Sequence, residues 1–207
     1  MRHIPSSDTF HADVLSFEDA LIPTADDFDR NRWIYIPDHY SEYRYVLGTR
    51  GLHPLICIGI NPSTAAPDRL DNTLKSAQRI ATANGFDSFI MFNVYAQRAT
   101  LPDDMEKVFN PALHRENMKA FEWVLRHCSA PCSVWAAWGS IITKRDYLPG
   151  CVRDMVAVGN RYGARWFTAG QRSKAGHPHH PLYLRSDSPL EPFDDLLSYL
   201  DSLSGHS

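Results

Sequence analysis

Four short apolar segments occur along the chain, and a polar residue or a glycine directly follows the first three of them. None shows a strict alternation of apolar and polar positions. Continuous apolar runs of this kind are typical of strands that are buried on both faces of a parallel sheet. The predicted strands cover residues 55–60, 89–92, 133–138 and 165–168.

Segments predicted as helices lie between and after these strands. Asp71, Asn72 and Thr73 are suitable caps for the first of them, and Gly85 ends it. The predicted helices cover residues 74–84, 112–127, 152–160 and 193–203. This alternation of strand and helix predicts an α/β fold, a three-layer sandwich around a central, mainly parallel four-stranded sheet.

The first part of the chain has a different character. Residues 1–40 are acidic and aromatic, prolines interrupt them, and we predict an N-terminal arm with one short helix near residues 17–21. A strand is expected at residues 43–47, followed by a turn. Residues 41–207 are then predicted to be a single α/β domain, since a chain of 207 residues suffices for one sizeable core.

Composition narrows the class of protein. The chain is 43% hydrophobic and 22% charged, as expected of a folded soluble protein, and its net charge of -3 argues against a strongly basic nucleic-acid-binding surface. A local basic face is compatible with that total. With no visible signal peptide and no apolar run of membrane-spanning length, we expect a cytoplasmic protein with free thiols and no membrane partner.

The cysteines are a weak signal for a metal site, because Cys128, Cys132 and Cys151 do not contain a Cys-x-x-Cys pair. Cys57 lies in a predicted strand and suits a buried thiol.

Three loops carry the candidate chemistry. They span residues 59–73, 93–100 and 176–184, and the first two leave predicted strands at their carboxyl ends. Open α/β sheets bind their ligands at that edge, so we expect the loops to form one cleft. Asn61 follows the first strand directly, and its amide can both donate and accept hydrogen bonds.

Short motifs in these loops resemble a bacterial family described only as a domain of unknown function. The resemblance runs from about residue 43 to residue 184, or about two-thirds of the chain. The matching motifs are Asn61–Ala65, Asp71–Thr73, Asn93–Thr100, Ala137–Gly139 and His180–Leu184. This resemblance implies no activity.

A more distant resemblance is to the uracil-DNA glycosylase superfamily. Gly59–Ser63 resembles the Gly-Ile-Asn-Pro motif that activates water in the thymine/mismatch-specific branch, and Phe92–Asn93 resembles the strand end whose asparagine reads a pyrimidine. Trp138–Ser140 resembles a Leu-Trp-Gly-Ser strand end, and His177–Leu182 resembles the His-Pro-Ser-Pro-Leu loop that enters the minor groove. The order along the chain agrees. The resemblance implies a uracil-DNA glycosylase-like sandwich.

The chemistry of N-glycosidic cleavage and of base binding suggests roles for individual residues. The candidate catalytic residues are Asn61, Asp71, His177 and His180, and the candidate substrate-binding residues are Gly59, Ser63, Asn93, Tyr95, Arg98 and Gly139. Asn61 would orient a water, Asp71 would take its proton, and a histidine would donate to the departing base. Tyr95 would stack on the base, and Arg98 would hold a phosphate or carboxylate.

Each candidate has a structural alternative. Asn61 suits a turn before Pro62, Asp71 a helix cap, and Asn93 a bond to the backbone of a strand end. Tyr95 suits packing in the core. Arg98 suits an ion pair with Asp103 or Asp104. The three histidines at positions 177, 179 and 180 suit a metal cluster or, with their flanking prolines, a rigid loop.

The chain also departs from the glycosylase pattern. Asn61 replaces the acidic residue of the uracil-specific branch, and His180 stands where that family has serine. The extra residue in this loop makes His177 and His180 competitors for one role. The predicted function is nucleobase binding by a glycosylase-like protein that hydrolyses the N-glycosidic bond of a damaged or modified base in DNA. A non-catalytic nucleotide or modified-base binding module and a nucleotide or nucleoside hydrolase are the alternatives, and no cofactor or metal is expected.

Overall fold

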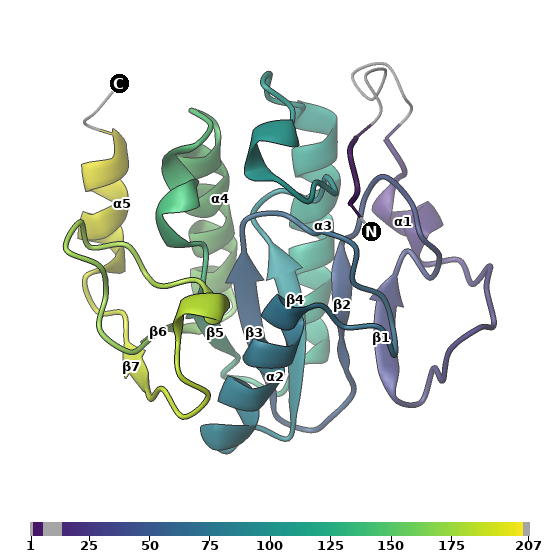
Figure 1. The fold of residues 1–207 in the computed structure, drawn as a ribbon, viewed down its shortest axis with the longest axis horizontal. Helices are drawn as coiled ribbons and strands as arrows, with labels where there is room; N and C mark the ends of the chain where they lie inside the picture. Colours follow the sequence, from purple (N-terminus) through teal and green to yellow (C-terminus); the bar gives the residue numbers. More distant parts are fainter. Residues whose placement is uncertain (1, 6–13, 205–207) are drawn as a thin grey trace.

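A single mixed sheet organises the computed structural model, which describes residues 2–5 and 14–204. Within these residues the sheet has seven strands in the order β1-β2-β4-β3-β5-β6-β7 (Figure 1). The strands are β1 (Trp33–Ile36), β2 (Val46–Thr49), β3 (Pro54–Gly59), β4 (Ser88–Asn93), β5 (Ser133–Ala136), β6 (Arg165–Ala169) and β7 (Leu190–Pro192).

The four strands predicted from the apolar segments form the parallel centre of the sheet. β4, β3, β5 and β6 lie next to one another, with Gly59 of β3 paired with Asn93 of β4. The sheet is larger than the predicted four strands, because β1, β2 and β7 extend its two sides in antiparallel orientation. The carboxyl ends of the central strands therefore meet at one edge, where the predicted loops begin.

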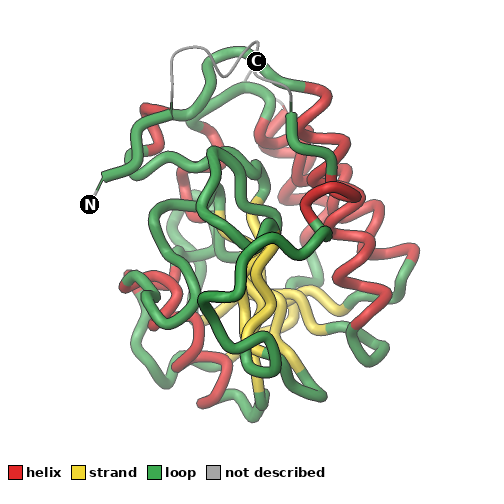
Figure 2. The backbone as a smooth tube through the Cα atoms, turned by 90° about the vertical axis from the view of Figure 1, so that its right-hand side faces the viewer, coloured by secondary structure: helices red, strands yellow, loops and turns green. Residues whose placement is uncertain are grey.

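Two helical layers cover the sheet, as the side view in Figure 2 makes visible. One face carries α2 (Asn72–Ala83). The other face carries α1 (Phe17–Ala20), α3 (Pro111–His127), α4 (Leu148–Arg161) and α5 (Leu196–Ser204). Successive residues of a strand point to opposite faces, so Cys57 and Met91 pack under α2 while Ile58 and Phe92 pack under α3 and its neighbours.

Local sequence explains where the helices begin. Oδ1 of Asp71 accepts a hydrogen bond of 2.9 Å from the backbone nitrogen of Leu74, so Asp71 is the N-cap of α2. Asn110 caps α3 in the same way, and Pro111 occupies the first position of that helix, where the missing N–H costs nothing. Three 3₁₀ turns, Pro102–Asp104, Gly139–Thr143 and Pro181–Tyr183, lie in the loops near the carboxyl edge.

The N-terminal part contributes more secondary structure than its sequence indicates. The predicted short helix is present as α1, but residues 1–40 also contain β1, which the pattern of prolines and acidic residues did not indicate. β1 pairs with β2 along its whole length and forms one side of the sheet. In the described residues, no helix is long and apolar enough to cross a membrane.

Candidate functional site

A cavity of about 780 Å³ opens at the carboxyl edge of the central strands, on the face that carries α2. This volume lies within the range of about 300–1,000 Å³ that is usual for small-molecule sites. Its lining includes eight of the ten candidate residues from the sequence: Gly59, Asn61, Ser63, Asp71, Asn93, Gly139, His177 and His180. Loops that are far apart in the chain thus form one concave surface.

Asn93 lies at the end of β4 with its side chain only 1% exposed. Both Nδ2 and Oδ1 are buried and have no hydrogen-bond partner among the described residues. The strand end is instead held by Asn117 of α3, whose Nδ2 donates to the carbonyls of Asn93 and Val94 at 3.0 and 3.1 Å. An unpaired buried donor or acceptor costs about 1–3 kcal/mol, so the free amide of Asn93 requires a functional explanation.

Gly59 provides the space beside this amide. A methyl group added at Gly59 would lie 2.6 Å from Cε of Met91 and 3.3 Å from Oδ1 of Asn93. Because Gly59 and Asn93 are paired residues of neighbouring strands, their side-chain directions share one face of the sheet. The missing side chain therefore lets Met91 and the amide of Asn93 lie close to the backbone of β3 at the cavity lining.

Asn61 uses only half of its amide within the protein. Its Nδ2 donates to the carbonyl of Ala99 at 2.7 Å and to that of Pro62 at 3.1 Å, and these bonds hold the first loop to the second. Its Oδ1 has no hydrogen bond to a described residue. Ser63 continues the same connection, with its hydroxyl 3.2 Å from that of Thr100. Asn61 thus combines the predicted turn with a free acceptor at the cavity.

His177 is held by contacts on both its backbone and its ring. Its backbone nitrogen donates to the hydroxyl of Ser173 at 3.0 Å, and its Nδ1 lies 3.0 Å from the hydroxyl of Tyr199 in α5. That hydroxyl accepts a bond of 3.1 Å from Nε1 of Trp138, which only donates, so the hydroxyl's own hydrogen is available for donation to Nδ1. Burial lowers the pKa of His177, and a neutral ring that accepts this bond at Nδ1 carries its hydrogen on Nε2.

His180 occupies another part of the lining. Its Nδ1 lies 3.4 Å from the backbone nitrogen of Leu182, as a cap of the 3₁₀ turn that follows. Burial lowers the pKa of His180, and the negative charge of Asp71 partly opposes that shift. Gly139, at a φ of +63°, lies against this loop, since a methyl group there would be 3.5 Å from Cβ of His180. The positive φ favours glycine at this turn.

Arg44 is a cavity residue that sequence reasoning missed. It is 1% exposed, its Nε has no hydrogen-bond partner among the described residues, and one Nη donates to the carbonyl of Ala65 at 3.2 Å. Burial and the nearby charge of Arg98 lower the pKa of Arg44 to about 9, so it stays charged at neutral pH. The sequence contained one signal for this role of Arg44: it is a charged residue between Tyr43 and Tyr45, inside a segment predicted to be a strand.

Tyr95 and Arg98 do not line the cavity, in contrast to the prediction from the sequence. Tyr95 is fully buried, and its hydroxyl donates to Glu106. Arg98 is also fully buried, donates to the carbonyl of Ser63 and to the hydroxyl of Tyr35 (2.9 Å), and lies over the ring of Tyr40 at 4.3 Å. The reason is that the segment before β2 and the segment after β4 remain side by side, through a bridge between Tyr43 and Gln97, and this pairing buries residues 95–98.

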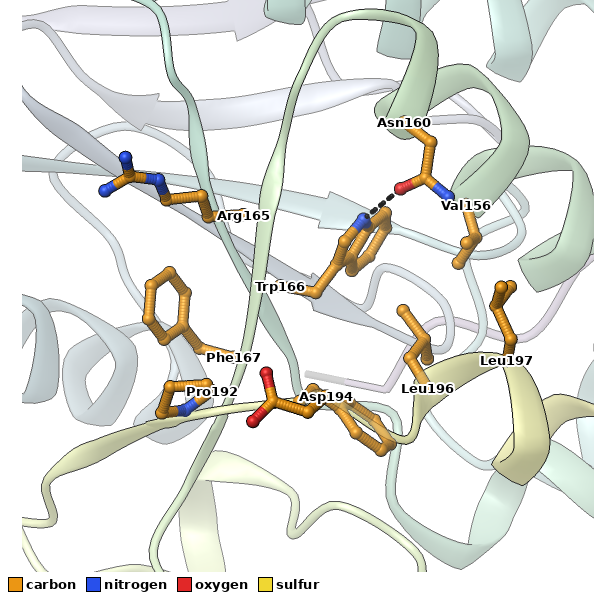
Figure 3. Close-up of a pocket in the computed structure, with 10 residues that line it drawn as sticks. Val156, Asn160, Arg165, Trp166, Phe167, Pro192, Asp194, Leu196 and Leu197 are labelled. Atoms are coloured by element: carbon orange, nitrogen blue, oxygen red, sulfur yellow. Dashed lines mark hydrogen bonds between the residues drawn. The ribbon is translucent and has the colours of Figure 1, made fainter.

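A second hollow of about 470 Å³ lies between β6, β7, α4 and α5 (Figure 3). Its walls are mainly apolar, and its indole nitrogen, Nε1 of Trp166, donates to Asn160 at 3.2 Å. The charged groups Arg165 and Asp194 lie exposed at its rim. It contains none of the residues singled out from the sequence and offers no buried polar group without a partner.

The histidine loop and the cysteines hold no evident metal centre. Within residues 2–5 and 14–204, no group of three or more His, Cys, Asp or Glu side chains is placed to hold an ion. Cys128 and Cys132 interact with each other, which lowers the pKa of Cys132 to about 7, and Cys57 is buried in β3. These thiols lie away from the cavity lining.

Fold and cavity together define an α/β protein with a cavity, lined by apolar and polar residues, at the carboxyl edge of its parallel strands. The family model described as "Protein of unknown function (DUF1643)" matches residues 44–182, and the chain belongs to this family. A comparison with curated proteins gave no match. The matched segment begins at Arg44 and ends after His180, so it contains most of the cavity lining, whereas Tyr199 lies beyond it.

Proposed function

We propose that this protein is a nucleobase-binding, glycosylase-like hydrolase that releases a base from a nucleotide. The observation that carries this proposal is the buried, unpartnered amide of Asn93 at a cavity of small-molecule size. A carboxamide offers one donor and one acceptor side by side, which matches the paired hydrogen-bonding groups on the edge of a base. Gly59, the strand partner of Asn93, lines the same cavity, so no side chain of β3 at this position competes with the base.

Hydrolysis of an N-glycosidic bond needs a positioned water and stabilisation of the negative charge on the departing base. The free Oδ1 of Asn61 accepts a hydrogen bond from that water and so orients its lone pairs toward the sugar. Asp71 is the one carboxylate among the described lining residues and takes the proton of the water. Its oxygen Oδ1 also caps α2, so the same side chain has the helix-capping role that the sequence offered as the alternative to catalysis.

The departing base is stabilised by a hydrogen-bond donor of the histidine loop. His177 presents Nε2–H as a neutral ring, because Tyr199 holds Nδ1. A fixed neutral donor stabilises developing negative charge, and the loss of one such donor typically costs about a hundredfold or more in rate. His180 has its Nδ1 occupied as well and is the rival for this role.

The resemblance to the uracil-DNA glycosylase superfamily supports the proposal at the level of fold. The parallel strands β4, β3, β5 and β6, covered by helices on both faces, are compatible with a uracil-DNA glycosylase-like sandwich. The motifs that carry the resemblance lie at one cavity. Fold alone does not determine chemistry, so the proposal depends on the site residues.

The test is a panel of substrates incubated with the purified protein. Oligonucleotides and free nucleotides that carry uracil, hypoxanthine, mismatched thymine or alkylated bases are scored for abasic sites and for free base. We expect release of one base or a narrow set of bases. Binding of a base without release would favour the non-catalytic binding module, and neither binding nor release across the panel would refute the proposal.

A further inference from the structure

Two buried arginines near the cavity, Arg44 and Arg98, are not neutralised by ion pairs. Among the described residues, neither Arg44 nor Arg98 forms an ion pair with a carboxylate, although both are almost fully inaccessible to solvent. Asp71 and Glu42 act on them only at longer range. A buried charge without a partner is expensive, so an unpaired guanidinium that lines a cavity indicates an anionic ligand.

The amino end of α2 meets Arg44 at the same cavity. Asn72, Thr73 and Leu74 of the first turn are lining residues, together with Arg44. Leu74 N–H is used by Asp71, whereas the N–H groups of Asn72 and Thr73 have no acceptor within their helix. Free N–H groups at the start of a helix of this length bind anions, and the helix dipole adds to the attraction.

Exposed arginines near the histidine loop show the opposite arrangement. Arg172 makes a two-pronged contact with Asp195 at 2.9 and 2.7 Å, and Arg185 contacts Asp187 at 3.0 and 3.1 Å. The charges of these two arginines are therefore matched by carboxylates, in a chain with a net charge of -3. A nucleic acid backbone would need exposed, unpaired basic residues, whereas a small anion can reach a cation inside the cavity.

We infer that the cavity holds the phosphate of a free nucleoside monophosphate between Arg44 and the amino end of α2, while Asn93 holds the base. This inference rests on the proposed function and names its substrate class. A guanidinium binds a phosphate with two parallel N–H donors, and the donors of the helix end approach from another side. The cavity volume is sufficient for a nucleotide of this size.

The test compares matched pairs of nucleosides and nucleoside 5′-monophosphates by titration calorimetry. The pairs carry the four DNA bases, uracil and hypoxanthine, and single-stranded oligonucleotides of the same bases form the third arm. We expect a monophosphate to bind at least about tenfold more tightly than its nucleoside and than the oligonucleotide. A nucleoside that binds as tightly as its monophosphate would overturn the inference and leave the proposed function intact.

Two variants locate the phosphate, with one matched control. Arg44→Gln and Asn72→Pro are each expected to reduce the preference for the monophosphate by at least about fivefold while affinity for the nucleoside stays unchanged. Proline is tolerated at the first position of α2, where it removes one free N–H, and Asp71 before it is already extended (ψ 176°). Arg126→Gln, on the exposed surface of α3, should leave the preference unchanged.

The outcomes separate the two proposals. If Arg44→Gln fails to fold, Asn72→Pro still tests the subsite, and an unchanged preference in that variant overturns the inference. Base release from oligonucleotides alone, without binding of any monophosphate, would also overturn it while supporting the proposed function. Absence of binding and release in all three arms would refute both.

Discussion

Nδ1 of His177 lies 3.0 Å from the hydroxyl oxygen of Tyr199, which is itself 3.1 Å from the indole nitrogen of Trp138. Three separate segments thus contribute to one chain of hydrogen bonds: the end of β5, the histidine loop and α5. Burial raises the pKa of Tyr199 to about 12, so the phenol keeps its hydrogen at neutral pH and donates it to His177. This chain determines which nitrogen of His177 faces the cavity with a hydrogen.

The first prediction concerns this chain. Tyr199→Phe removes the donor to Nδ1, so we expect the pKa of His177 to rise toward that of a free histidine and its tautomers to become mixed. Nitrogen NMR titration of the imidazole measures both properties. Tyr183→Phe, at an exposed tyrosine of the same region, is the control and should change neither. An unchanged pKa and tautomer in Tyr199→Phe would contradict this assignment.

Stability should depend on pH through the two histidines of the cavity. Burial holds the pKa values of His177 and His180 below 6.5, the usual value, which they regain in the unfolded chain. Below that pH the unfolded chain binds more protons, so stability falls as the pH drops through the folded pKa values and is fully retained above 6.5. Urea unfolding at about pH 7.5 and about pH 5.5 measures how much the free energy of unfolding decreases at the lower pH. We expect a smaller decrease in the double variant His177→Gln/His180→Gln than in the wild type. Equal losses in both proteins would exclude this linkage.

Arg98 is expected to be essential for stability rather than for ligand contact. Its guanidinium connects the loop after β3 to Tyr35 of β1, and it contacts the ring of Tyr40. Arg98→Ala removes these contacts and leaves buried acceptors unpaired, so the free energy of unfolding should fall by on the order of 3 kcal/mol or more. Chemical denaturation measures this value. The matched surface variant Arg126→Ala should change it by less than about 0.5 kcal/mol, and a similarly small effect of Arg98→Ala would refute the structural role.

Gly59→Ala should crowd the amide of Asn93. The added methyl group would displace Cε of Met91, the flexible end of a side chain, and press on Oδ1 of Asn93. We expect affinity for the base to fall by about tenfold or more with little loss of stability. Gly150→Ala is the control, because a methyl group there meets no atom within 4 Å and improves the helical propensity of α4. Unimpaired base binding in Gly59→Ala would show that the base does not lie there.

Much of the central fold was predictable from local patterns. Buried parallel strands must be apolar along their whole length, and this requirement identified β3, β4, β5 and β6. β1 was not predicted, because it is four residues long, lies among prolines and acidic residues, and is ordered by pairing with β2. Such tertiary pairing leaves little trace in local sequence.

The candidate site was predictable at strand ends and less so beyond them. Asn61 and Asn93 were found because a polar residue directly after a buried strand must lie at the carboxyl edge. Tyr95 and Arg98 follow the same strand, yet continued pairing beside Tyr43 directs them into the core. Arg44 was missed for the converse reason, since it belongs to an apolar segment and reaches the cavity only through the fold.

The most direct test of the proposed function exchanges one hydrogen-bonding group of Asn93 in the cavity lining. Asn93→Asp replaces the donor Nδ2 with an acceptor and keeps the shape of the side chain. Free base released from the substrate panel is measured by chromatography for wild type and for this variant. We predict release of one base or a narrow set by the wild type, with a rate at least about a hundredfold lower in Asn93→Asp. Release at the wild-type rate in the variant would contradict recognition of the base by Asn93.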